Sequence, residues 1–138
     1  MKPETFRYDR LIKSEDLNHH RTLFAGRCAE WFVEAGFIAA ASALPANNIV
    51  CLQIHGLSFT SPIHSGDIAR FSSKIIHVGR TSLKVYVDLV RQGNEEIIVK
   101  GFITFVHVDN NGQPEPHGLT LELSEPEDIE LNQLAENL

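Results

Sequence analysis

A long apolar segment between residues 23 and 44 contains only three charged side chains, and two of these are carboxylates. Arg27, Glu30 and Glu34 are three and four residues apart, so they form one narrow stripe if the segment is a helix. A carboxylate in such a stripe can act as a general base or a nucleophile. The unpaired N–H groups at a helix start can bind an oxyanion. The stripe and the loop before it are therefore the first place to look for chemistry.

The composition of this segment predicts a buried helix. Ala, Gly, Phe and Trp dominate, and no charged residue follows Glu34 before Pro45. Proline cannot continue a helix and disfavours helical geometry at the residue before it, so we expect the helix to end at Leu44. Because a helix that is apolar on nearly all sides is a buried helix, the rest of the chain should wrap around it. Trp31 and Phe32 are expected in core or dimer packing.

Five other segments alternate polar and apolar residues or are rich in β-branched residues, and these predict strands at 5–12, 49–60, 68–78, 82–91 and 96–109. A bulge or bend is expected at Gly56. Tight turns at 79–80 and 92–94 favour antiparallel pairing. A short helix is predicted from Ser124 to Leu134. The order predicts one α+β domain over 1–138, with an antiparallel sheet of about five strands around one long central helix.

Composition limits the classes of partner and compartment. The chain has 138 residues, a net charge of −6 and no cluster of Lys or Arg, which argues against binding of a nucleic-acid backbone. Cys28 and Cys51 lie among apolar residues and are expected to be buried thiols in a reducing compartment. The N-terminus lacks an apolar signal core, and no apolar stretch reaches 18 residues. We therefore predict a cytoplasmic protein without a membrane span, and the scattered histidines predict no metal site.

Five segments, in chain order, resemble the hotdog-fold acyl-CoA thioesterases, in particular the small bacterial acyl-CoA hydrolases: LNHHRTLFAG, WFVEAGFIAA, SFTSPIHSGD, VGRTSLKVYVDL and FITFVHVDNNGQP. The resemblance covers roughly Asp16 to Pro114. It implies a hotdog fold, with dimers that join two sheets edge to edge and often form higher assemblies, such as a dimer of dimers. It also implies hydrolysis of an acyl-CoA to free acid and CoA at the dimer interface. No metal or cofactor is implied, and the acyl-CoA is the expected ligand.

The resemblance also implies roles for individual residues. Asn18 matches the family asparagine that holds the attacking water or the carbonyl. Ala25 and Gly26 replace the family Gly-Gly pair, whose N–H groups at the helix start polarise the thioester carbonyl. Glu34 is predicted as the catalytic carboxylate, and Glu30 is a second candidate. The turn after residue 79 is expected to contact the pantetheine or phosphates of CoA through Arg80, Thr81 and Ser82.

Two positions depart from the family pattern. Val33 lies seven residues after Gly26, where the family has its acid, and valine cannot act as a base or nucleophile. Glu34 is offset from that position by about 100° around a helix, and Glu30 by about 60°. Arg21 stands where the family loop has glycine. The alternative function is therefore a non-hydrolytic acyl-CoA-binding or regulatory protein that has lost its acid.

Other interpretations of these residues stay open. Glu34 could be a solvent or interface residue, and Glu30 could simply pair with Arg27. His19 and His20 fit ordinary loop residues, and His55 fits a buried, hydrogen-bonded histidine better than a ligand contact. Dehydration of a hydroxyacyl thioester would need an Asp/His pair, which the sequence does not present. A purely structural role in dimerisation would leave the matches at Asn18 and in the GRTS turn unexplained.

Overall fold

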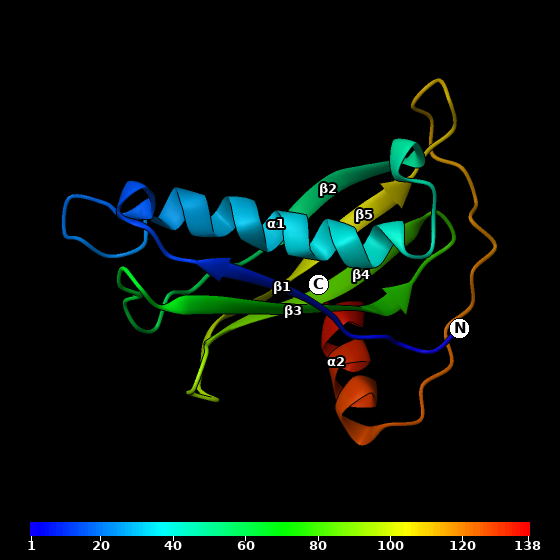
Figure 1. The fold of residues 1–138 in the computed structure, drawn as a ribbon. Coiled ribbons are helices and arrows are strands. Elements are labelled where there is room, and N and C mark those ends of the chain that lie inside the picture. The colour runs from blue at the N-terminus through cyan, green and yellow to red at the C-terminus, as the bar shows by residue number, and fades with distance from the viewer.

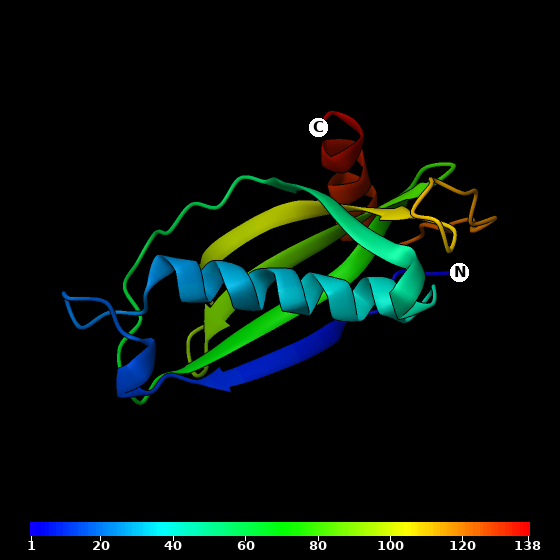
Figure 2. The same cartoon turned by 90° about the horizontal axis from the view of Figure 1, so that it is seen from above.

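The alternating segments form a five-stranded antiparallel sheet with one helix against each face (Figures 1 and 2). The computed structural model describes residues 1–138. Its helices and strands are, in order, β1 (Phe6–Leu11), α1 (Ala25–Ala41), β2 (Ile49–His55), β3 (Ile68–Val78), β4 (Ser82–Arg91), β5 (Ile97–His107) and α2 (Pro126–Glu136). The strand order is β1-β3-β4-β5-β2, with every neighbouring pair antiparallel. The predicted α+β class, five strands and two helices are confirmed.

Small residues let α1 lie close to the sheet. The predicted apolar face of β4 is buried, and it packs against the helix together with side chains of β3 and β5. Gly36 sits so close to β5 that an added Cβ would lie 2.6 Å from the Ile103 Cδ1 atom. The Ser73 hydroxyl of β3 donates to the Ala35 carbonyl at 2.7 Å. The Ala and Gly content of α1 thus permits this approach, and Trp31 and Phe32 are buried in the core as predicted.

The prediction that α1 is enclosed on all sides is wrong for its outward face. Glu30, Glu34 and Ile38 are exposed, because the sheet covers only one side of the helix. The helix also ends at Ala41, three residues before the predicted end. The Ser42 N–H bonds to the Ala39 carbonyl, and the chain tightens into a turn before Pro45 is reached. The exposed face of α1 becomes important for the site described below.

Strand β2 is shorter than predicted, since it ends at His55. Gly56 follows with φ +70°, a left-handed conformation that favours glycine, so the predicted bend is present. The bulge itself lies between Cys51 and Gln53. Cys28 is buried, but Cys51 is exposed, so the prediction of two buried thiols is wrong for Cys51. Cys51 is exposed because β2 is an edge strand that pairs only with β5.

Helix α2 packs against the face of the sheet opposite α1 (Figure 2). Its cap residue is Glu125, not the predicted Ser124, and Pro126 occupies the first turn. Ala135 joins a small buried cluster with Ile76 and Tyr86. Neither α1 nor α2 is long and apolar enough to cross a membrane.

Candidate active site

Asn18 organises the loop that leads into α1. Its Oδ1 atom accepts hydrogen bonds from the backbone N–H of His20 at 2.8 Å and of Thr22 at 3.2 Å. Its Nδ2 atom donates to the Thr22 hydroxyl at 3.1 Å. The side-chain oxygen is therefore committed to the loop. Because an amide nitrogen carries two donors, Asn18 keeps one N–H for a ligand.

Arg21 occupies the tip of this loop with φ 63°, and it is the only non-glycine residue with positive φ. Its N–H donates to the Asn18 carbonyl at 3.0 Å, which closes the turn. A left-handed conformation costs an L-residue about 1–2 kcal/mol, whereas glycine adopts it readily. The geometry explains why a glycine suits this position, and the arginine holds the same loop at an energetic cost.

The Arg21→Gly variant is expected to be more stable than the wild type by about 1 kcal/mol, because the strain at positive φ is relieved. Urea denaturation followed by circular dichroism would measure the difference in the free energy of unfolding. The control is Arg80→Gly, which replaces another exposed arginine at ordinary φ. An equal gain in both variants would contradict the explanation, since it could not then arise from the loop conformation.

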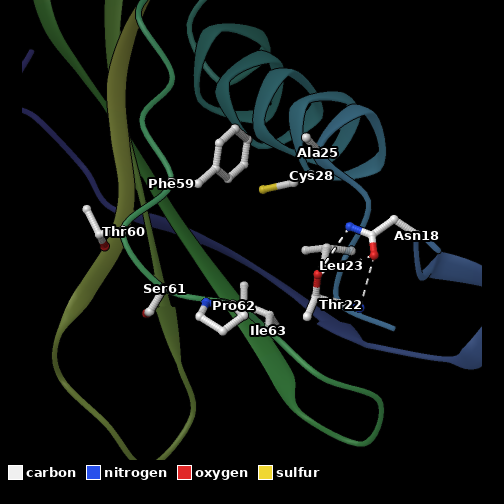
Figure 3. A pocket seen from close by; sticks show the side chains of 10 residues that line it. All are labelled: Asn18, Thr22, Leu23, Ala25, Cys28, Phe59, Thr60, Ser61, Pro62 and Ile63. Carbon is white, nitrogen blue, oxygen red and sulfur yellow. Dashed lines mark hydrogen bonds between the residues drawn. The ribbon is translucent and has the colours of Figure 1, made fainter. Parts of the chain in front are cut away.

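A pocket of about 400 Å³ lies between this loop, the start of α1 and the extended segment that follows β2 (Figure 3). The Leu23 N–H donates to the Ile63 carbonyl at 2.8 Å, which fixes the loop against that segment. Asn18 and Phe59 lie on opposite sides of the pocket, with Cys28 between them. Burial raises the pKa of the Cys28 thiol to about 12, so it stays protonated and is a poor nucleophile. The lining is completed by Thr22, Ala25, Thr60, Ser61 and Pro62.

The start of α1 presents unpaired donors beside this pocket. The first N–H that bonds back to the Phe24 carbonyl is that of Cys28, at 3.0 Å. The N–H groups of Ala25, Gly26 and Arg27 therefore have no acceptor within the helix, and no side chain caps them. A Cβ on Gly26 would lie 2.6 Å from the Phe24 ring, so glycine is needed for this ring position. Of the predicted carbonyl-binding residues, Asn18 and Ala25 line the pocket, and Gly26 follows Ala25 in the first turn of α1.

The predicted catalytic carboxylate Glu34 does not line this pocket. Glu34 lies nine positions after Ala25, which places it about two and a half turns and about 14 Å further along α1, on the opposite side of the helix. Glu34 Oε2 instead accepts a hydrogen bond from the hydroxyl of Tyr8 in β1. Both residues border a second, mainly apolar hollow of about 400 Å³ over the outward face of α1, lined also by Val33, Phe37, Ile38, Cys51 and Phe105. Within one chain, Asn18 and Glu34 therefore belong to different cavities.

Glu30 is exposed on the outward face of α1, and the expected pair with Arg27 is not formed. Arg27 Nε lies 3.8 Å from the buried Asp16 Oδ1 instead. Asp16 precedes the loop, and its carbonyl accepts the N–H of Phe24 at 2.9 Å. The basic side chain near the helix start thus ties the loop to α1. It leaves Glu30 as a free carboxylate.

The structure separates the predicted CoA-binding turn from the pocket. Arg80, Thr81 and Ser82 follow the far end of β3, an 11-residue strand that spans about 35 Å. The turn is held by the Gly79 N–H, which donates to the Ser82 carbonyl at 2.9 Å, and it lies at the end of the sheet opposite the start of α1 (Figure 1). One chain does not bring these three residues to Asn18. His55 lies 2.7 Å from the Thr104 hydroxyl, so the predicted hydrogen bond is present, but the residue is half-buried and not buried as predicted.

Sequence reasoning missed Thr22 and Phe59 at the pocket, and Tyr8 beside Glu34. Thr22 and Phe59 lie inside segments that carried the family resemblance, but no spacing rule marks them as pocket residues. The Ser61-Pro62 break after an apolar run was the signal that a loop follows β2. Tyr8 gave no signal, because its contact joins residues 26 positions apart in the chain.

Residues 20–98 match the family model of the thioesterase superfamily. An uncharacterized acyl-CoA thioester hydrolase of Bacillus subtilis (strain 168) is 30% identical over 105 residues, which are 73% of this chain and 60% of that protein. A similar hydrolase of Zymomonas mobilis is 31% identical over 84 residues, 58% of this chain and 55% of that protein. The matched region is thus less than two thirds of the length of these relatives.

Solved structures share the fold. An acyl-CoA hydrolase from Bacillus cereus is 26% identical, with a TM-score of 0.88 over 96% of this chain and 82% of that chain. An apo-hexameric acyl-CoA thioesterase is 28% identical, with a TM-score of 0.86 over 96% of this chain and 86% of that chain. A Staphylococcus aureus acyl-CoA hydrolase, solved with butyryl-CoA and CoA, is 22% identical, with a TM-score of 0.85 over 96% and 80%. The predicted hotdog fold is confirmed.

Proposed function

Because this chain belongs to the thioesterase superfamily, we propose that it hydrolyses acyl-CoA thioesters to a free acid and CoA. The observation that carries the proposal is the convergence of the free Asn18 Nδ2 donor and the unpaired N–H groups of α1 on one pocket. Such donors stabilise the oxyanion that forms when a thioester carbonyl is attacked. The acyl-CoA thioester hydrolases among the relatives support this choice of substrate class.

The proposed reaction needs a base as well as an oxyanion site. A carboxylate oxygen takes one proton from water while the water oxygen forms a bond to the thioester carbon. The C–S bond then breaks, and the proton passes from the carboxylic acid to the departing sulfur of CoA. The reaction consumes one acyl-CoA and one water, and we propose that it proceeds through these protein groups without a metal or cofactor. We assign the base to Glu34, with Glu30 as the second candidate.

A second copy of the chain is proposed to bring the base to the pocket. No carboxylate lines the pocket of Asn18, whereas Glu34 lies on the outward face of α1. A two-fold axis at the free edge of β2 would place the two α1 helices antiparallel, so that the outward face of one approaches the start of the other. The same axis makes the strands of the second copy run in the opposite direction. The Arg80–Ser82 turn of the second copy then lies at the same end of the assembly as the start of α1 of the first, which favours its contact with CoA. The proposed unit is a homodimer, which could assemble further into a dimer of dimers.

Val33 favours a second candidate function, non-hydrolytic binding of acyl-CoA. The Staphylococcus aureus hydrolase has been solved with an asparagine and an aspartate each replaced by alanine, and these two residues are fifteen positions apart. Asn18 and Val33 have the same separation. Val33 packs partly buried against the core, so the position is filled by an apolar side chain in this protein. A chain that binds acyl-CoA and does not cleave it would fit this observation.

The assay that separates the two functions uses a panel of acyl-CoAs of increasing chain length. We expect release of free CoA by the wild type, and a fall in kcat/KM of about 100-fold in Asn18→Ala, because one oxyanion donor is lost. Asn18→Asp keeps the side-chain oxygen that the loop needs but removes the donor. It should therefore retain the stability of the wild type and lose activity.

Two other results would reject hydrolysis. Saturable binding of acyl-CoA without release of CoA would support the binding protein, and acquisition of hydrolysis by Val33→Asp would strengthen it. Absence of both binding and cleavage across the panel would reject both functions. We also propose that the protein acts in the cytoplasm, a reducing compartment that suits the free thiols of Cys28 and Cys51.

A further inference from the structure

The carboxylate proposed as the base is held by two residues of a different element. Glu34 accepts the hydroxyl of Tyr8, and Tyr8 Oη in turn accepts a hydrogen bond from Arg10 Nη1 at 2.8 Å. We propose that Tyr8 and Arg10 of β1 are positioning residues that orient Glu34 for catalysis. This inference rests on the proposed hydrolysis, and it gives the carboxylate one position beyond Val33 a defined orientation.

The polarity of this chain of hydrogen bonds is fixed by the chemistry of its members. A guanidinium group can only donate, so Arg10 must donate to Tyr8 Oη. The single hydroxyl proton of Tyr8 is then directed to Glu34 Oε2. A donor on one carboxylate oxygen orients the group and leaves Oε1 available to take a proton from water. The arrangement is that of an oriented base.

The two side chains that hold Glu34 also contact the buried core. The Arg10 guanidinium lies 4.6 Å from the ring centroid of Trp31, a side chain with only 1% exposure. A cation over an aromatic face is held electrostatically as well as by packing. The Tyr8 ring lies 6.2 Å from that of Phe71, its cross-strand neighbour in β3. The cross-strand neighbour of Arg10 is the small residue Ala69, which leaves room for the guanidinium.

The surroundings keep Tyr8 in the donor state. Burial raises the pKa of the Tyr8 hydroxyl, and the hydrogen bond to Glu34 raises it further. The phenol is therefore protonated throughout the neutral range. The hollow that Tyr8 and Glu34 border is otherwise mainly apolar, so few other groups compete for the carboxylate. An ion pair on the surface would leave the Glu34 side chain free to move, whereas the hydrogen bonds from Tyr8 and Arg10 restrain it.

The test is the Tyr8→Phe variant, which keeps the ring against Phe71 and removes only the hydroxyl. We expect kcat to fall about tenfold with KM nearly unchanged, since a hydrogen bond to a charged group is lost. Arg10→Lys should show a smaller effect in the same direction.

Asp9→Asn is the matched control, because Asp9 lies between the two residues and pairs instead with Arg70 on the other side of β1. It should leave both kcat and KM unchanged. An active wild type whose kcat does not respond to Tyr8→Phe would overturn the positioning role and leave the proposed hydrolysis intact. Absence of hydrolysis by the wild type would overturn both.

Discussion

A mixed dimer of Asn18→Ala and Glu34→Gln subunits is expected to recover about half of the wild-type hydrolysis, whereas each variant alone should be nearly inactive. Loss of the base is expected to lower kcat by about 10²–10⁴-fold. In a mixed dimer with composite sites, one site carries both substitutions and the other carries neither. The recovery follows because the pocket of Asn18 has no carboxylate of its own chain.

The mixed dimer can be isolated by coexpression of the two variants with different affinity tags and two successive purifications. Initial rates would be compared with those of each variant purified in the same way. A mixed dimer as inactive as its parents would show that Asn18 and Glu34 act within one chain, which contradicts the composite site. If Glu30→Gln abolishes hydrolysis and Glu34→Gln does not, the base is Glu30.

Local sequence patterns predicted the helices and strands of this fold, because the alternation of polar and apolar residues and the residues at turns act over short distances along the chain. The alternation in β4 marks a face that is buried against α1, and both strand and face were predicted. The pattern overextended β2, because the chain turns at Gly56, with φ +70°, and residues 57–60 keep only one backbone hydrogen bond to β5, from the Thr60 N–H to the Ile98 carbonyl. It also misplaced Cys51, because burial in an edge strand depends on what lies beyond the edge.

The site was predictable only where it is local in sequence. Asn18 and the start of α1 are seven residues apart, so loop and helix signals sufficed to bring them together. Arg27 pairs with Asp16 and not with Glu30 as expected, because the loop before α1 places the buried Asp16 carboxylate beside the helix start. The contact of Tyr8 with Glu34 depends on how β1 lies beside α1. No pattern along the chain encodes that placement.

Leu52→Lys is expected to convert the proposed dimer to a monomer and abolish hydrolysis. Leu52 is the bulged residue of β2 and is 67% exposed in the single chain. The bulge also gives Cys51 and Ile54 the same face, since they oppose Phe105 and Ile103 of β5.

An apolar surface therefore continues from the free edge of β2 to the hollow over α1. Burial of this surface against a second copy of the chain is more favourable than its exposure to water. A lysine buried without a partner costs several kcal/mol, which should weaken the dimer by at least about 100-fold.

Leu11→Lys is the matched control, because Leu11 is 55% exposed on β1, the other edge strand of the same sheet. Light scattering coupled to size-exclusion chromatography would give the mass of each variant, and the acyl-CoA assay its activity. Dissociation caused by both substitutions, or by Leu11→Lys alone, would place the interface elsewhere. A monomeric Leu52→Lys variant with full activity would refute the composite site, because Glu34 of a second copy could no longer reach Asn18. Loss of mass and loss of hydrolysis in the same variant would link the free edge of β2 to the chemistry at the start of α1.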